Sequence, residues 1–148
     1  MIEFWPAFIP VPTMSRTGFL FALLLATIIP METASKSLND TKKIANDLAR
    51  EIILKGGPSV IALYGDLGSG KTAFTQFFAK ALGVREKVLS PTFVVIKTFK
   101  ISDANTRMHA NDANRFKFLV HIDAYRLKSA KDLLDLGFKD IIKDKGNI

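Results

Sequence analysis

The chain has no cysteine, one tryptophan, two tyrosines and two histidines among its 148 residues. Without cysteine it can form neither disulfide bonds nor thiolate-ligated metal sites, and a cytoplasmic location is expected. No block of five or more consecutive basic residues occurs, although lysine and arginine outnumber the acidic residues 21 to 14 and give a net charge of +7. High-affinity RNA binding by this chain alone is therefore not predicted, and the positive balance also suits nucleotide attraction.

The sequence also lacks an apolar run of the roughly 20 residues that a membrane-spanning helix needs. Its most apolar stretch, Gly18–Ile29, has twelve residues and lies within residues 1–30, which hold four of the six prolines. Three interpretations of that segment remain open: an over-extended start with Met31 as the true initiator, a membrane-surface anchor, or a signal peptide, for which Glu32 is a poor cleavage context. We interpret residues 1–30 as an extension outside the domain and residues 31–148 as one domain with no stable membrane association.

One octapeptide carries most of the chemical information in the chain. Residues 65–72 read Gly-Asp-Leu-Gly-Ser-Gly-Lys-Thr and match the phosphate-binding pattern G-x-x-x-x-G-K-[ST] at every fixed position. The glycines permit positive φ angles, so that main-chain N–H groups can close around phosphate oxygens. The Lys71 ammonium would reach the β- and γ-phosphates, and the Thr72 hydroxyl would ligate Mg²⁺. The predicted nucleotide-binding residues of this loop are Gly65, Asp66, Gly68, Ser69, Gly70, Lys71, Thr72 and Ala73.

The segments on either side of the octapeptide have the patterns that it requires. Residues 59–64 are an apolar run typical of a buried strand. Residues 73–82 contain no helix breaker, carry three phenylalanines at helical spacing, and precede Gly83, a typical helix terminator. A helix that begins at the loop points its positive end at bound phosphate. This strand–loop–helix order favours a phosphate-binding loop over an ordinary glycine-rich turn.

Two further helices are predicted from their capping residues. Ser37, followed by Asp40, resembles a capping box, and residues 38–55 then carry apolar side chains at the spacing of an amphipathic helix. A Gly-Gly-Pro sequence ends that helix. Ser129 with Asp132 indicates another capped helix, which ends near the next glycine.

Two strands are expected in the second half of the chain, at residues 93–99 and 117–122. The polar residues 102–115 between them are predicted to form a loop. Because only this loop joins the two strands, we expect them to pair in antiparallel fashion.

A carboxylate follows the second of these strands. Residues 118–123 read Phe-Leu-Val-His-Ile-Asp, which places Asp123 at the tip of an apolar strand. Phosphate-loop enzymes hold their Mg²⁺-associated acid in that position, because strand ends face the nucleotide. Lys71, Thr72 and Asp123 are therefore the predicted catalytic residues, and Thr72 and Asp123 the predicted Mg²⁺ ligands. The alternative for Asp123 is an aspartate that initiates a turn.

Four other polar residues have a functional and a structural interpretation each. His121 shares a strand face with Asp123, and a hydrogen-bonded strand histidine is the alternative to a chemical role. Arg126 would either neutralise the charge that develops on a phosphate or form a salt bridge. Ser90 and Thr92 flank a proline, where they would touch the γ-phosphate or form a rigid turn.

Taken together, these residues resemble the TsaE (YjeE) family, small bacterial ATPases required for the threonylcarbamoyl modification of tRNA adenosine at position 37. The similar segments keep their order and spacing between Ser37 and Ile142. They are the octapeptide, Leu-Gly at 82–83, Ser-Pro-Thr-Phe at 90–93, His-Ile-Asp-Ala-Tyr-Arg-Leu at 121–127 and Leu-Gly at 136–137. Many families share the octapeptide, whereas the segments at 90–93 and 121–127 are more specific.

The resemblance implies a P-loop NTPase-like α/β fold with three layers, α/β/α, around a mixed, mainly parallel central sheet. It also implies that ATP is bound and hydrolysed with Mg²⁺. The ATPase would gate or reset a complex of the TsaD and TsaB proteins, and tRNA would be an indirect partner through that complex. Thr41 resembles a family position near the nucleotide.

Family members continue with a strand that ends in a Glu-Trp pair, whose glutamate helps to hold Mg²⁺. The present sequence stops at Ile148, and we interpret it as C-terminally truncated, which leaves its turnover open. Two alternatives to an ATPase remain: a nucleotide-gated binding module without turnover, and a small-molecule kinase. A GTPase is disfavoured because no Asn-Lys-x-Asp element for guanine is present.

Overall fold

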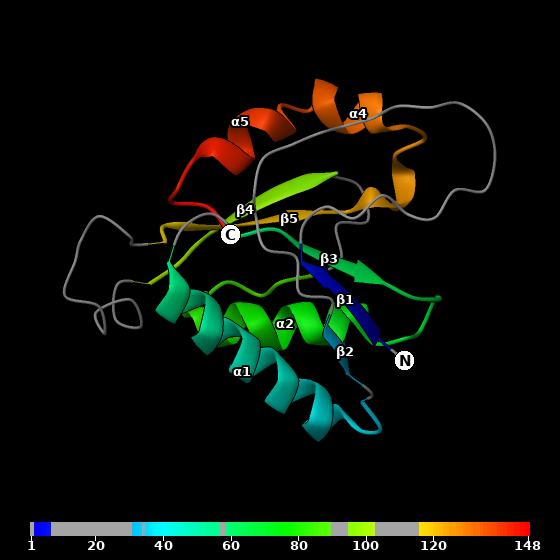
Figure 1. Cartoon of the computed structure of the whole chain (residues 1–148), viewed down its shortest axis with the longest axis vertical. Helices are drawn as coiled ribbons and strands as arrows, with labels where there is room; N and C mark the ends of the chain where they lie inside the picture. Colours follow the sequence, from blue (N-terminus) through cyan, green and yellow to red (C-terminus); the bar gives the residue numbers. More distant parts are fainter. Residues whose placement is uncertain (1, 7–30, 34, 57–58, 90–94, 103–115) are drawn as a thin grey trace.

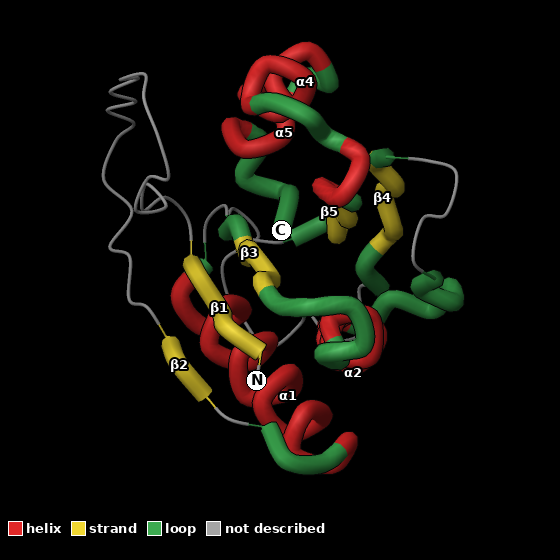
Figure 2. Tube along the Cα trace, turned by 90° about the vertical axis from the view of Figure 1, so that its right-hand side faces the viewer, coloured by secondary structure: helices red, strands yellow, loops and turns green. Residues whose placement is uncertain are grey.

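The computed structural model describes residues 2–6, 31–33, 35–56, 59–89, 95–102 and 116–148 (Figure 1). Within them the fold is mixed α/β, and two pairs of helices lie on opposite sides of the strands (Figures 1 and 2). The elements in chain order are β1 (Ile2–Pro6), β2 (Met31–Thr33), α1 (Leu38–Lys55), β3 (Ile61–Tyr64), α2 (Lys71–Leu82), β4 (Ile96–Lys100), β5 (Phe118–Ile122), the 3₁₀ turn η2 (Ala124–Arg126), α4 (Ala130–Asp135) and α5 (Phe138–Lys143).

Helix α1 begins and ends where the sequence predicts. The Asp40 N–H donates to the Ser37 hydroxyl at 3.1 Å, and the Asp40 carboxylate accepts the N–H of Lys36 at 3.1 Å. At the other end, Gly56 adopts a positive φ of 65°, and its N–H donates to the Ile52 carbonyl at 3.0 Å. Both ends of α1 are therefore set by local hydrogen bonds that the sequence encodes.

The hydrophobic core combines the facing sides of α1 and α2, which run side by side (Figure 1), with side chains from β4, β5 and the segments next to them. Ala45 and Ala49 of α1 are almost completely buried, and these small side chains allow close approach of the helices. On α2, the Phe74 and Phe78 rings stack with their centroids 5.8 Å apart and are 1% and 2% exposed. Phe77 packs partly buried against the same core. The three phenylalanines that lie at helical spacing in the sequence therefore serve core packing.

Helix α2 ends at the predicted glycine. Gly83 takes the left-handed conformation with φ of 92°, and its N–H donates to the Lys80 carbonyl at 3.1 Å. Gln76 fixes the following segment, because its Nε2 donates to the Val88 carbonyl at 2.9 Å. Val84 and Val88 thereby return to the core.

The strand pairs within the described residues are antiparallel, which differs from the mainly parallel sheet that the family resemblance implies. Strand β1 pairs with both β2 and β3, in the order β2-β1-β3. Strand β4 pairs with β5, with Lys97 opposite His121, as expected for two strands that only a loop joins. β3 and β5 do point the same way in Figure 1, but they are not hydrogen-bonded neighbours. The ladders between named strands are therefore all antiparallel, because β3 and β5 are not hydrogen-bonded to each other.

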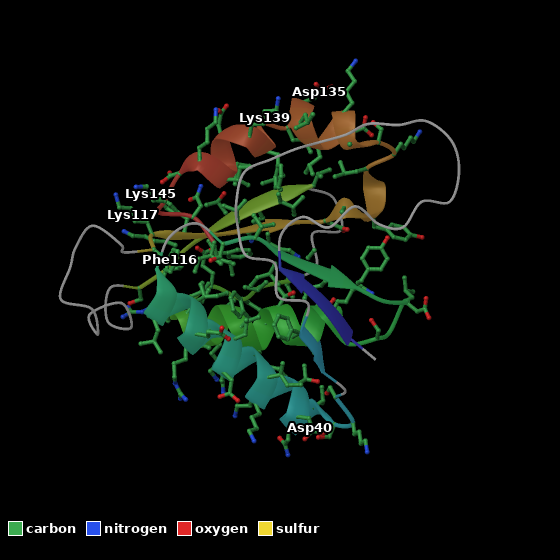
Figure 3. All side chains as sticks on the ribbon, viewed as in Figure 1. Asp40, Phe116, Lys117, Asp135, Lys139 and Lys145 are labelled. Atoms are coloured by element: carbon green, nitrogen blue, oxygen red, sulfur yellow. The ribbon has the colours of Figure 1, made fainter. Side chains whose placement is uncertain are left out.

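One parallel contact is present, and it comes from the end of the chain. Residues 146–148 run alongside the beginning of β5, with a bridge between Phe118 and Asn147. Ile148 is 8% exposed and joins the core. Figure 3 places Lys117 and Lys145 together at this end of β5. Asp123 follows the opposite end of the strand.

Several predictions fall partly or wholly outside the described residues. These are the apolar stretch within residues 7–30, the Ser-Pro-Thr-Phe segment, and the loop at 103–115. In the ranges that the structure covers, no helix is both long and apolar enough to cross a bilayer. Residues 2–6, which we assigned to the extension, form β1 and pair with β3. The domain boundary after residue 30 stays a prediction.

Candidate functional site

The phosphate-loop octapeptide connects β3 to α2, as its strand–loop–helix context predicts. The loop turns at residues 66–69, where the Ser69 N–H donates to the Asp66 carbonyl at 3.1 Å. Gly68 and Gly70 have φ angles of 83° and 94°, which a side chain at either position would strain. The glycine spacing of the motif therefore matches the backbone conformation of this loop.

The amino-terminal end of α2 has no side-chain cap. Gly70 occupies the N-cap position, and its carbonyl accepts the first helical hydrogen bond, from the Phe74 N–H at 2.9 Å. The N–H groups of Lys71, Thr72 and Ala73 belong to the first turn, where an α-helix has no acceptor of its own for them. Together with the helix dipole, these donors form a site suited to an anion.

Lys71 bonds to its own loop. Its Nζ atom donates to the Gly65 carbonyl at 2.5 Å, to the Asp66 carbonyl at 2.7 Å, and to the Ser69 hydroxyl at 3.2 Å. An ammonium group has three protons, so these contacts use all of its donors. Lys71 therefore holds the loop closed on itself, and contact with a phosphate would exchange at least one of these oxygens.

Asp123 lies directly after β5, and β5 and β3 both end at the right of Figure 1, so its segment and the phosphate loop share one edge of the fold. The Asp123 side chain is half-buried, and its Oδ1 accepts the Tyr125 N–H at 3.1 Å. This bond is the turn-initiating contact that we weighed as the alternative. It uses one carboxylate oxygen, and a Mg²⁺ role for Asp123 stays a prediction.

The residues present fit the chemistry of a magnesium site. The exposed Thr72 hydroxyl and the Asp123 carboxylate are hard oxygen donors, which Mg²⁺ prefers, and this ion keeps several waters when few protein ligands are available. Among the described residues, no group of three or more histidine, aspartate and glutamate side chains could hold a metal by itself. Bound phosphates would therefore have to supply further ligands.

The Thr41 hydroxyl makes two contacts near the beginning of α1. It is 5% exposed, its Oγ1 donates to the Ser37 carbonyl at 3.1 Å, and it lies 2.6 Å from the Ser35 hydroxyl. These contacts secure the first turn of α1. The predicted position of Thr41 near the nucleotide stays a prediction.

His121 is largely buried on β5, and its Nδ1 has no hydrogen-bond partner among the described residues. Burial lowers the pKa of His121 from its ordinary value of 6.5, and the nearby Asp123 carboxylate partly opposes this shift. The lowered pKa favours the neutral side chain at pH 7, and within the described part of the chain Nδ1 lacks the hydrogen bond that a structural strand histidine would make.

The lowered pKa of His121 predicts a pH dependence of stability. Below pH 6.5 the unfolded chain binds a proton that the folded chain does not, so the free energy of unfolding should fall from pH 6.5 down to the folded-state pKa. Urea denaturation of the chain and of His121→Gln at several pH values measures this loss. The variant should lack the histidine-dependent slope, and an identical slope in both proteins would contradict the assignment.

Comparison with known proteins identifies the family. The model of the family described as "Threonylcarbamoyl adenosine biosynthesis protein TsaE" matches residues 35–148. The chain belongs to the TsaE family. The match includes the phosphate loop and Asp123, and it begins after the segment that we interpret as an extension.

Three relatives of this TsaE-family chain carry the name tRNA threonylcarbamoyladenosine biosynthesis protein TsaE. The Treponema pallidum protein is 32% identical over 78% of this chain, and the Rickettsia conorii protein is 34% identical over 76%. The Bacillus subtilis protein is 38% identical over 59%. The aligned part of the chain spans 73%, 54% and 46% of these three relatives, respectively. No solved structure gave a significant match.

Three exposed apolar side chains near the site were not identified from the sequence. Tyr64 precedes the loop, Leu67 lies within it, and Tyr125 follows Asp123, with exposed fractions of 59%, 91% and 86%. Leu67 occupies a variable position of the phosphate-loop pattern, so the pattern assigns it no role. Tyr64 ends a strand whose apolar sequence predicts burial. Only its place at the last strand position could have indicated that its side chain is exposed.

Proposed function

We propose that this TsaE-family chain binds ATP with Mg²⁺ at residues 65–72 and hydrolyses it during the biosynthesis of threonylcarbamoyl adenosine in tRNA. The beginning of α2 is the observation that carries this proposal. An uncapped helix follows directly after a loop with positive-φ glycines, and Lys71 lies across that loop. This combination suits the polyanionic tail of a nucleoside triphosphate.

Each proposed ligand has a distinct task. The N–H groups of the first turn of α2 would bind phosphate oxygens, and Lys71 would move from loop oxygens to the β- and γ-phosphates. Thr72 and Asp123 would hold Mg²⁺, which bridges the phosphates and neutralises the charge that develops during transfer. Together they form the proposed catalytic set.

The proposed setting is a larger assembly in the cytoplasm. In it, ATP hydrolysis by this chain gates or resets the TsaD and TsaB proteins, and tRNA is contacted through that assembly. The proposed complete fold is a three-layer P-loop NTPase domain, which the helices on both sides of the strands support (Figure 2).

A direct test measures ATP binding by calorimetry and phosphate release by a coupled assay, each with Mg²⁺, with and without TsaD and TsaB. Saturable ATP uptake with phosphate release supports the proposal. Uptake without release, even with the partner proteins present, would identify a nucleotide-gated binding module instead. No uptake of either ATP or GTP by folded protein would contradict nucleotide binding altogether.

Asp123→Asn should reduce Mg²⁺-dependent phosphate release by about a hundredfold, the scale of losing one preorganised electrostatic group. Nucleotide binding without Mg²⁺ should change much less, because the amide leaves the loop and α2 intact. Calorimetry with and without Mg²⁺, beside the release assay, separates the two effects. The matched control is Asp132→Asn in the cap of α4. Equal losses with and without Mg²⁺ would exclude the metal role.

A further inference from the structure

The segment that follows α2 runs back along that helix. It begins at Val84, whose N–H donates to the Ala79 carbonyl at 2.9 Å and which forms a bridge with Ile101, directly after β4. Further on, the Val88 carbonyl accepts a hydrogen bond from the Gln76 Nε2 at 2.9 Å. Because residue 76 precedes residue 79 on the helix, the segment runs toward the end of α2 at which the phosphate loop lies.

The Gln76 amide fixes a segment without regular structure. Residues 85–89 belong to no helix or strand. Val88 is buried, whereas the three charged residues before it and Leu89 after it are exposed. A carbonyl only accepts hydrogen bonds, so a donor is needed to hold the Val88 carbonyl in place. Gln76 supplies that donor from α2.

Gln76 lies one turn after Thr72 on the same face of α2. Residues four apart in a helix are neighbours on its surface. Thr72 and Gln76 are both exposed, as their shared face requires. The bond to Val88 therefore joins the returning segment to the face of α2 that carries the proposed Mg²⁺ ligand Thr72.

Two hydroxyl residues with a predicted role at the γ-phosphate follow this segment. Ser90 comes directly after Leu89 and Thr92 two residues later, and both lie outside the described residues. Their two predicted roles are a γ-phosphate contact and a rigid turn. Either role depends on where the chain leaves Leu89, and Gln76 fixes the residue before it.

We propose that Gln76 is a positioning residue of the phosphate site. Through the Val88 carbonyl it holds residues 84–89 against the Thr72 face of α2, and so couples them to Mg²⁺ and the terminal phosphate. This inference rests on the proposed function. Gln76 itself touches neither the nucleotide nor Mg²⁺ in this role. Lys71 and the N–H groups of the first helical turn bind a diphosphate without it, so MgADP affinity is independent of Gln76, whereas the step at the γ-phosphate depends on it.

Gln76→Met keeps the length of the side chain and removes its donor. Phosphate release from MgATP, with and without the partner proteins, should fall at least about tenfold, since small misplacements can cost up to about a hundredfold. Calorimetric MgADP affinity should stay within about twofold of wild type, because only the step at the γ-phosphate is affected. The control is Lys80→Met, the same new side chain one turn further along α2, which should retain wild-type release.

The Leu89 amide reports the Gln76 bond directly, because its nitrogen belongs to the same peptide group as the Val88 carbonyl. In ¹⁵N spectra of the full chain without nucleotide, Gln76→Met should shift this amide. In the wild-type chain, MgADP and the Mg²⁺ complex of the non-hydrolysable analogue AMP-PNP should give the Leu89 amide different positions. In Gln76→Met the two positions should coincide.

Equal losses of MgADP affinity and phosphate release in Gln76→Met would show a merely structural role and overturn the inference. The same loss of release in Lys80→Met would also overturn it. If the wild-type chain binds nucleotide without releasing phosphate, the Leu89 comparison decides, and identical behaviour of this amide in wild type and Gln76→Met contradicts the inference. No nucleotide uptake by the wild-type chain would refute the proposed function together with the inference. Wild-type turnover that Gln76→Met leaves unchanged would refute the inference alone.

Discussion

Lys71→Ala is expected to lower the affinity for MgATP at least a hundredfold, equivalent to about 3 kcal/mol of binding free energy. The ammonium group is the positive side chain of the loop, and alanine offers the triphosphate neither charge nor a donor. The same change removes three hydrogen bonds that close the nucleotide-free loop, to Gly65, Asp66 and Ser69. Calorimetric titration with MgATP measures the first effect, and amide exchange of residues 65–70 measures the second.

Lys80→Ala is the matched control for this experiment, because it removes an exposed lysine from the last turn of the same helix. It leaves the net charge equal to that of Lys71→Ala, so a general electrostatic effect would weaken both variants alike. Wild-type affinity in Lys80→Ala with lost affinity in Lys71→Ala is the expected pattern. Unchanged MgATP affinity in Lys71→Ala would contradict the assigned role of the loop.

Phe74→Ala should lower the free energy of unfolding by about 3–5 kcal/mol, the range for large-to-small changes at buried aromatic positions. Its ring is 1% exposed and stacks on Phe78, so truncation leaves a cavity at the centre of the core. Urea denaturation monitored by circular dichroism measures the loss. A small domain has only about 5–15 kcal/mol in total, so the variant should be near the limit of folding at 37 °C.

Phe77→Ala, on the same helix, provides the comparison, because Phe77 is only partly buried against the core. It should destabilise the chain measurably less than Phe74→Ala. Equal losses of unfolding free energy in the two variants would contradict the expectation that the more deeply buried ring contributes more to stability.

Local signals predicted α1, α2 and α4, whereas α5 (Phe138–Lys143) was not predicted. The Ser37 cap and the glycine after Lys55 gave both bounds of α1, and Gly83 gave the end of α2. Such ends depend on hydrogen bonds between residues at most five positions apart, so the sequence pattern contains their cause. The antiparallel β4–β5 pair was also predictable, since one loop joins these strands.

Strand neighbours far apart in the sequence were not predictable. Nothing in the composition of residues 2–6 indicates pairing with β3, and we assigned them to an extension. The mainly parallel sheet implied by the family resemblance is not seen in the described ladders. Which strands become neighbours depends on tertiary packing that local propensity does not determine.

For the candidate site too, local features were predictable from the sequence and contacts made in the folded chain were not. The loop conformation followed from its glycines, because positive φ angles are a local property. The three Lys71 contacts and the turn bond of Asp123 could not be read from the pattern, since they depend on rotamers within the folded loop and turn. The pattern also gave Thr41 no indication of its bonds to Ser35 and Ser37.

The antiparallel contact between β1 and β3 gives the choice of start site a physical meaning. A polypeptide made from Met31 onward would retain β3 but not its neighbour at residues 2–6. The main-chain groups along that side of β3 would then be open to pairing with other molecules, a known route to self-association. The pairing with residues 2–6 therefore shields one edge of the strand that leads into the phosphate loop.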